Sequence, residues 1–206
     1  SNYTISGVTS ALSANITAAP VTISGLSASN KTYDTTTTAV LTGTPTAAGV
    51  LSGDTVTVSG SATAGSFASA NVATGISVTP TLSGLTLSNS NYTISGVTSA
   101  LSANITAAPV TVTIVKDYNG STAVSNGQIT VTGVAGQTLV LTGTATLTNP
   151  NVGSAALSTL NGASLSDGTG LASNYTLTNP NSSVTINPVA ISITASNAEK
   201  VYDRST

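Results

Sequence analysis

Apolar and small polar residues alternate along much of the chain with the period of two that is typical of β-strands. In Asp54–Ser59 the valines occupy every second position, so they lie on one face of an extended strand. Gln128–Val131 and Val189–Ile193 repeat the pattern with β-branched residues, which favour strands. Because no segment sustains the 3.6-residue period of a helix with its capping residues, the pattern predicts strands throughout and at most one helical turn near Tyr33–Ala39.

Turn dipeptides and prolines divide these strands. The Asn-Gly pairs that predict tight turns are Asn119-Gly120, Asn126-Gly127 and Asn161-Gly162. Prolines stand between two strand-like pieces at Pro20, Pro109 and Pro188. Since proline cannot donate to a sheet ladder, it belongs at the start or edge of a strand, and we expect the domain boundaries there.

The chain repeats itself with a domain-sized period. Residues 1–22 recur letter for letter at 90–111, and a Lys-x-Tyr-Asp/Asn anchor occurs at Lys31, Lys116 and Lys200. Its tyrosines lie 85 and 84 residues apart, at Tyr33, Tyr118 and Tyr202. This period predicts the tail of one repeat over 1–18, complete repeats over 19–107 and 108–187, and the head of another over 188–206.

These features together predict an all-β fold of tandem repeat domains, each of about 80–90 residues. The strand pattern leaves an immunoglobulin-like β-sandwich and a β-grasp-like topology equally open. Because the predicted linkers are almost absent, an elongated, stiff array is expected. The aromatic side chains expected in the cores are Tyr33, Phe67, Tyr92, Tyr118 and Tyr175.

Composition narrows the range of partners. Charged residues make up 5% of the chain, and Lys and Arg together number four, so a basic surface for nucleic acid is not expected. No apolar run approaches the roughly 18 residues of a membrane helix. The chain has no Cys, which excludes disulfides and thiolate metal sites.

The order of the recurring anchors resembles that of a known family. Lys31-Thr32-Tyr33-Asp34 near the start of a repeat, Gly53-Asp54-Thr55-Val56 in its middle and Asn91-Tyr92-Thr93-Ile94 near its end resemble the YDG repeats of filamentous-haemagglutinin-like adhesins. These are two-partner-secreted surface proteins of Gram-negative bacteria. The resemblance implies a location on the bacterial cell surface or outside the cell. The second repeat departs from the motif, with Asn119 and Gln137 at the positions of the first repeat's two aspartates.

Those departures argue against catalysis. The chain has no His, and neutral side chains stand in the second repeat where Asp34 and Asp54 stand in the first, so no acid–base pair is shared by the repeats. We therefore expect no enzyme activity, cofactor or metal site. The motif residues are expected to be structural: Lys31, Tyr33, Asp34, Asp54, Tyr92, Lys116, Tyr118, Asn119, Tyr175, Lys200, Tyr202 and Asp203. The tyrosine of each Lys-x-Tyr anchor is expected to be packed, with its hydroxyl bonded to backbone.

The function expected from this reasoning is that of structural stalk repeats of an extracellular adhesin. The strands carry few of the charges that normally protect sheet edges, so association with neighbouring repeats and other copies, into filaments or a matrix, is expected. The alternative is a repeat module that binds surface glycans or a receptor. No nucleic-acid partner and no membrane span are expected.

Overall fold

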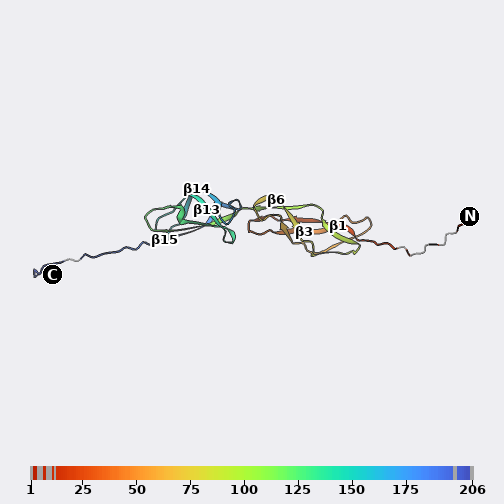
Figure 1. Cartoon of the computed structure of the whole chain (residues 1–206), viewed down its shortest axis with the longest axis horizontal. Helices are drawn as coiled ribbons and strands as arrows, with labels where there is room; N and C mark the ends of the chain where they lie inside the picture. The colour runs from red at the N-terminus through yellow and green to blue at the C-terminus, as the bar shows by residue number, and fades with distance from the viewer. Residues whose placement is uncertain (1, 4–6, 8–10, 12, 197–198, 205–206) are drawn as a thin grey trace. The chain divides into compact units, whose positions relative to one another are not determined.

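The computed structural model describes residues 2–3, 7, 11, 13–196 and 199–204. The chain divides into two compact units, Ser1–Thr106 and Ala107–Thr206, and each is described by itself. Figure 1 labels β1, β3 and β6 in the first unit and β13, β14 and β15 in the second.

The first unit contains the strands β1 (Ala19–Ala28), β2 (Lys31–Thr32), β3 (Thr38–Ala48), β4 (Val58–Gly60), β5 (Ala64–Phe67), β6 (Ala73–Pro80), β7 (Leu85–Leu87), β8 (Tyr92–Val97) and β9 (Leu101–Thr106). The main sheet has the order β2-β9-β6-β5-β3-β1-β8, and β4 pairs with β7 in a separate ribbon. Strand β1 is antiparallel to β3 and parallel to β8. Because β8 and β9 are consecutive in the chain but stand near opposite ends of this order, the sheet must curl until its ends approach each other.

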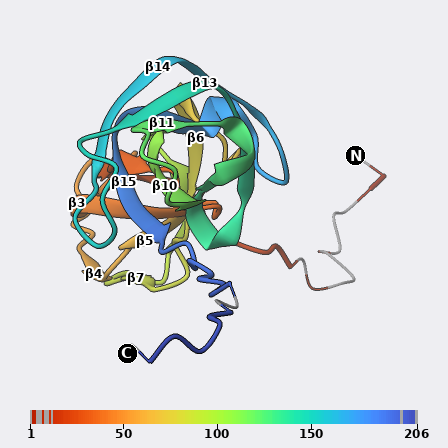
Figure 2. The same cartoon turned by 90° about the vertical axis from the view of Figure 1, so that its left-hand side faces the viewer.

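The second unit contains β10 (Ala108–Asp117), β11 (Ala123–Val124), β12 (Ile129–Thr132), β13 (Thr138–Leu147), β14 (Leu157–Asp167) and β15 (Tyr175–Asn187). Short 3-10 turns lie at η1 (Asn126–Gln128), η2 (Val134–Gly136) and η3 (Ala172–Asn174). The sheet has the order β11-β13-β12-β10-β15, with β14 also paired to β13. Strand β10 is antiparallel to β12 and parallel to β15. Figure 2 shows β13 and β14 arching over β10 and β11 in this curled arrangement.

The first long strand of each unit supplies the centre of its core. Val21 and Ile23 of β1 are buried, and Val110, Val112 and Ile114 of β10 have 0% exposure. Their alternation with threonine sends the β-branched side chains inward and the hydroxyls outward. Burial of each Val or Ile contributes roughly 1.5–3 kcal/mol, so this strand accounts for much of the driving force of its unit.

The all-β prediction is confirmed, since the residues that the structure describes contain strands and short 3-10 turns but no α-helix. The segment Tyr33–Ala39, where at most one helical turn was expected, contains none. That segment is a bend leading into β3, and Thr35 takes the left-handed conformation there with φ 71°. Within the described residues, no helix is long and apolar enough to cross a membrane.

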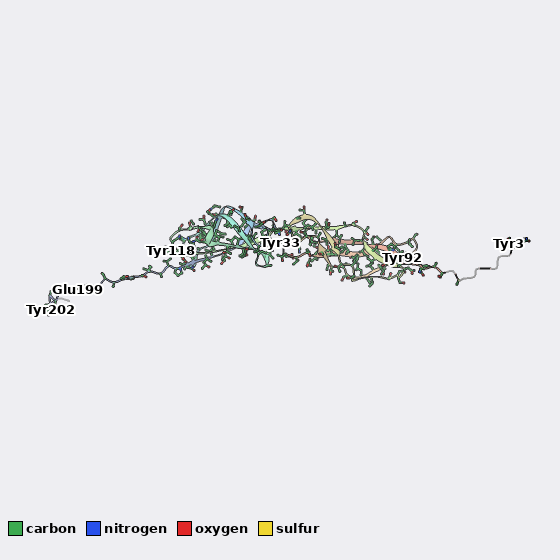
Figure 3. The ribbon with its side chains drawn as sticks, in the orientation of Figure 1. Tyr3, Tyr33, Tyr92, Tyr118, Glu199 and Tyr202 are labelled. Atoms are coloured by element: carbon green, nitrogen blue, oxygen red, sulfur yellow. The ribbon has the colours of Figure 1, made fainter. Side chains whose placement is uncertain are left out.

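Four of the five aromatic residues predicted in the cores are buried: Tyr33, Phe67, Tyr92 and Tyr175. Tyr118 is the exception, with 45% of its surface exposed, and its labelled side chain lies at the surface in Figure 3. Its backbone N–H donates to the Asn187 carbonyl at 2.9 Å. The same turn therefore buries its tyrosine in the first unit and leaves it exposed in the second.

Candidate functional site

The Asn-Tyr-Thr anchor of the first unit places a buried phenol against the middle of the repeat. Tyr92 begins β8, and its hydroxyl donates to Oδ2 of Asp54 at 2.6 Å. The Tyr92 hydroxyl oxygen also accepts a hydrogen bond from the backbone N–H of Leu51 at 3.2 Å. The hydrogen bond to Asp54, together with burial, raises the pKa of the Tyr92 phenol above its ordinary value. The hydroxyl thus joins β8 to the loop between β3 and β4.

The second unit keeps this arrangement with a neutral acceptor. The Tyr175 hydroxyl donates to Oε1 of Gln137 and accepts the Val134 N–H at 3.1 Å. The spacings agree in the two units: 38 residues separate each tyrosine from its acceptor, and 41 separate it from its N–H donor. An amide oxygen replaces a carboxylate oxygen without loss of the bond, so the site requires an acceptor and not a charge.

The Lys-x-Tyr-Asp anchor of the first unit is a lysine held over a tight turn. Lys31 Nζ donates to Oδ1 of Asp34 at 2.7 Å, to the Thr36 carbonyl at 2.7 Å and to Thr36 Oγ1 at 3.1 Å. It also lies 5.5 Å from the centroid of the Phe67 ring. Burial alone would raise the pKa of Asp34, but the hydrogen bonds from Lys31 and Thr36 outweigh it and hold the pKa of that carboxyl below its usual value.

In the second unit the corresponding lysine is more deeply buried. Lys116 is 3% exposed, and its Nζ donates to the carbonyls of Ser121 at 2.7 Å and Ala123 at 3.0 Å. Asn119 Oδ1 accepts the Ser121 N–H at 3.1 Å, as Asp34 Oδ1 accepts the Thr36 N–H in the first unit. In both units the lysine therefore closes the turn that follows the core strand.

The third anchor is not built into a sheet. Lys200 and Asp203 form an ion pair at 3.1 Å with about half of each side chain exposed, and Tyr202 is exposed. This i,i+3 pair matches Lys31–Asp34, so the local pairing of lysine and aspartate forms there outside a described strand.

The predicted motif residues therefore form separate sites. Tyr92 meets Asp54 and Lys31 meets Asp34, so the two aspartates have different partners. Sequence reasoning missed the backbone donors at Leu51 and Val134, although the constant spacing of 38 residues between each tyrosine and its acceptor was a signal for the pairing. It also missed the buried Asn174, which nothing in the repeat pattern distinguishes from other asparagines.

Tyr92 helps to line two of the hollows in the first unit. A groove of about 640 Å³ runs between β7 and β8, lined by residues that include Leu85, Leu87 and Ile94. A smaller hollow of about 410 Å³ lies beside the phenol site, where Tyr92, Asp54 and Asn91 contribute to its wall. In the part of the chain that the structure describes, no group of three or more His, Cys, Asp or Glu side chains could hold a metal ion.

Comparison with protein families identifies the units. The YDG domain family matches residues 17–100 and 102–183. The chain belongs to the YDG domain family. No curated protein and no solved structure shows a significant match to this chain.

This finding corrects the sequence-based assignment to filamentous-haemagglutinin-like adhesins. What is found is a YDG domain, matched twice, and not an adhesin repeat. The stalk function and the glycan- or receptor-binding alternative were derived from that assignment and are corrected with it. The associated descriptions as adhesin, secreted and matrix protein have no support either. The shared anchors were correctly linked to a YDG unit, but nothing in their chemistry specifies an adhesin.

Proposed function

We propose that the two YDG domains are non-catalytic modules in which the motif side chains hold the fold together. One observation carries the proposal: the motif atoms are engaged by hydrogen bonds within their own domain, in the same way twice. The Tyr92 and Tyr175 hydroxyls each bind one acceptor and one backbone donor. The Lys31 and Lys116 ammonium groups each bind carbonyl oxygens of the following turn.

The exchange of acids for amides between the domains supports this reading. A catalytic acid or base must gain and lose a proton, which neither Gln137 nor Asn119 can do under ordinary conditions. Gln137 nevertheless accepts from the tyrosine hydroxyl as Asp54 does, and Asn119 accepts the backbone N–H two residues on as Asp34 does. Because the acceptor oxygen is retained when the acid is replaced by an amide, these residues act as hydrogen-bond acceptors that hold the fold.

Assays with chromogenic esters, phosphate esters and glycosides test the proposal. The protein should give no turnover above that of buffer. The contradicting result is turnover that copurifies with the protein and is abolished in Asp54→Asn while the far-ultraviolet circular dichroism remains unchanged. Asp117→Asn serves as the matched control, since Asp117 accepts from the Asn187 side chain and lies outside the phenol site.

We also propose that the two domains are tandem repeats of one fold. Each begins with a long strand that is parallel to the strand opened by the Asn-Tyr-Thr anchor and antiparallel to a strand that follows it. The parallel pairing begins at equivalent places, Ala19 with Tyr92 and Ala108 with Tyr175. Independent unfolding of the separately expressed ranges 17–106 and 107–187 would support two repeats of one fold.

The family match brings a second candidate, recognition of DNA or of a modified base. The YDG name is shared with the SET- and RING-associated type of DNA-binding domain. In this chain, the hollow beside Asp54 and Tyr92 offers a carboxylate oxygen that could accept from an exocyclic amino group. Contacts with phosphate would contribute little, because the chain has four Lys and Arg in all, and Lys31 and Lys116 are bound within their own domains.

Fluorescence anisotropy with methylated and unmethylated duplexes at low salt separates the two candidates. Base recognition requires saturable binding that depends on methylation, changes little with salt and is lost in Asp54→Ala, which removes the acceptor oxygen. The Asp117→Asn variant should bind as the unmodified protein does. Absence of saturable binding at the lowest salt would remove this candidate and leave the structural one.

We propose as a partner the sheet edge of another copy of the chain. Val189, Ile191 and Ile193 are 55%, 88% and 91% exposed, whereas Val110, Val112 and Ile114 have the same alternating spacing and 0% exposure. An exposed alternating apolar segment is suited to strand addition. Sedimentation should show concentration-dependent association that Ile191→Asp abolishes, and a protein that stays monomeric at high concentration would exclude this partner. The extracellular location remains a prediction, testable by fractionation of the source cells.

A further inference from the structure

The turn after the core strand shares one backbone feature and one hydrogen bond in the two domains but has a different residue pair. Asp34-Thr35 occupies it in the first domain and Asn119-Gly120 in the second. The second residue of each pair has φ 71°, and the side-chain oxygen of the first accepts the N–H two residues on. The second domain thus has an amide where the first has a carboxylate, within one geometry.

The Asn119-Gly120 pair is arranged for attack of the Gly120 backbone nitrogen on the side-chain amide. Asn119 is exposed, and apart from the two neighbouring residues no heavy atom lies within 4 Å of where a Cβ on Gly120 would stand, so there is open space beside the glycine. The Ser121 N–H donates to Asn119 Oδ1 at 3.1 Å. A donor on this oxygen withdraws electron density from Cγ, which makes the carbon more open to attack.

We propose that Asn119 is a site of spontaneous deamidation, and that its aspartate product forms the ion pair with Lys116 that Asp34 forms with Lys31. The deprotonated Gly120 nitrogen attacks Asn119 Cγ, the new C–N bond closes a succinimide ring, and the side-chain nitrogen leaves as ammonia. Water then opens the ring. Cleavage of the bond between Cγ and nitrogen gives aspartate, and cleavage at the main-chain carbonyl gives isoaspartate. No oxidant, reductant or cofactor takes part.

The aspartate product would face a buried cation. Lys116 is 3% exposed, and its acceptors are the uncharged carbonyls of Ser121 and Ala123. In the first domain the equivalent ammonium group, that of Lys31, donates both to the Asp34 carboxylate and to the Thr36 carbonyl, each at 2.7 Å. A carboxylate at position 119 therefore supplies the charged partner that Lys31 has in Asp34 and that Lys116 lacks, whereas isoaspartate lengthens the backbone and disrupts the turn.

The chain contains two internal comparisons for the reaction. Asn126-Gly127 lies within the η1 turn, where helical backbone fixes the glycine nitrogen. Asn161-Gly162 lies within β14, and the Asn161 side chain donates to Thr146 Oγ1 at 3.2 Å. Both pairs have the reactive sequence, but each is fixed by secondary structure, so they should react more slowly than Asn119-Gly120.

Peptide mass mapping during incubation of the folded protein at mildly alkaline pH tests the site. Replacement of –NH2 by –OH should appear first at Asn119, several-fold faster than at Asn126 and Asn161, with release of ammonia. In denaturant the three rates should converge. Equal rates in the folded protein, or a slower rate at Asn119 than in denaturant, would overturn the assignment, and Asn119→Gln should abolish the signal at this position.

Two variants test the ion pair without waiting for the reaction. Asn119→Asp should raise the unfolding midpoint of the second domain at neutral pH, and the gain should disappear as the carboxyl group is protonated or salt is added. Asn126→Asp makes the same change in charge away from Lys116 and should give no such gain. Equal midpoints for the two variants would refute the pairing, even if Asn119 proves to be the fastest site.

Discussion

Substitution of Gly133 by alanine isolates the packing of the Tyr175 ring. Gly133 has φ −101°, which alanine adopts without strain, so the added methyl group acts through its volume alone. A Cβ at this position would overlap Cζ and Cε1 of Tyr175. On the other side of the ring, a Cβ on Gly170 would stand 3.2 Å from Cε2. The ring is therefore enclosed by backbone on two sides, and only glycine fits beside it at 133.

The size of the effect follows from the two ways in which the site can respond. If the ring stays, the core is overpacked, which costs roughly 1–3 kcal/mol. If it moves, its hydroxyl loses the bonds to Gln137 and Val134, each of which contributes about 0.5–1.5 kcal/mol, and part of the ring's burial is lost as well. The two routes together bracket a loss of about 1–4 kcal/mol, a large part of the roughly 5–15 kcal/mol that stabilises an ordinary domain.

Denaturant unfolding followed by tyrosine fluorescence measures this loss, and hydrogen exchange assigns it to a domain. Protection should fall in Ala107–Thr206 and stay unchanged in Ser1–Thr106. Gly127→Ala is the control, because nothing lies within 4 Å of its Cβ, and it should change stability by less than about 0.5 kcal/mol. A double-mutant cycle with Tyr175→Ala should remove most of the cost of Gly133→Ala. If the cost persists without the ring, the clash with Tyr175 is not its cause.

Three further predictions concern the turns and the phenol site. Thr35→Gly should stabilise its domain and Gly120→Thr should destabilise its own, each by about 1 kcal/mol in denaturant titrations, because a β-branched residue is strained at φ 71°. The pKa of Asp34 is lowered in the folded state, so the contribution of Asp34 to the free energy of unfolding is present above the unfolded pKa of about 3.9 and is lost as pH falls through the folded pKa. Asp34→Asn should remove this dependence of the unfolding midpoint on acidic pH. The pKa of Tyr92 is raised by the hydrogen bond to Asp54, so the contribution of Tyr92 to the free energy of unfolding is complete below the unfolded pKa of about 10 and is lost as pH rises through the folded pKa. Asp54→Asn should lower the pKa of Tyr92 in a spectrophotometric titration and reduce the loss of stability at alkaline pH.

Many strands could be predicted from the sequence because their signal is local, but Val189–Ile193 has the same alternation and forms no strand in the structure. Alternation in segments such as Val110–Ile114 marks one buried face, and the structure buries that face completely. The curl of the sheets could not be predicted, because it depends on which strand closes on which. The parallel pairing of β1 with β8 joins residues more than 70 positions apart, and no local pattern encodes that choice.

For the candidate site too, the sequence predicted which residues matter but not all of the contacts that they make. The sequence identified Tyr92, Tyr175 and their acceptors as motif residues, but it assigned the tie between hydroxyl and backbone to the Lys-x-Tyr tyrosines. The expectation is wrong at Tyr118, whose side chain is exposed and whose backbone N–H makes a hydrogen bond to the Asn187 carbonyl. The recurrence of a tyrosine indicates a structurally important position, but whether its side chain is buried depends on neighbouring residues from strands that are distant in the sequence.

The replacement of Asp54 by Gln137 separates what the YDG domain requires from what it tolerates. The acceptor, the backbone donor and both spacings are kept, while the charge is lost. The same holds at the turn, where Asn119 replaces Asp34 and the hydrogen bond to the backbone remains. A carboxylate that can be exchanged for an amide with the geometry unchanged has its role in the hydrogen bond. In both domains these motif positions therefore contribute through a hydrogen bond that does not depend on a charge.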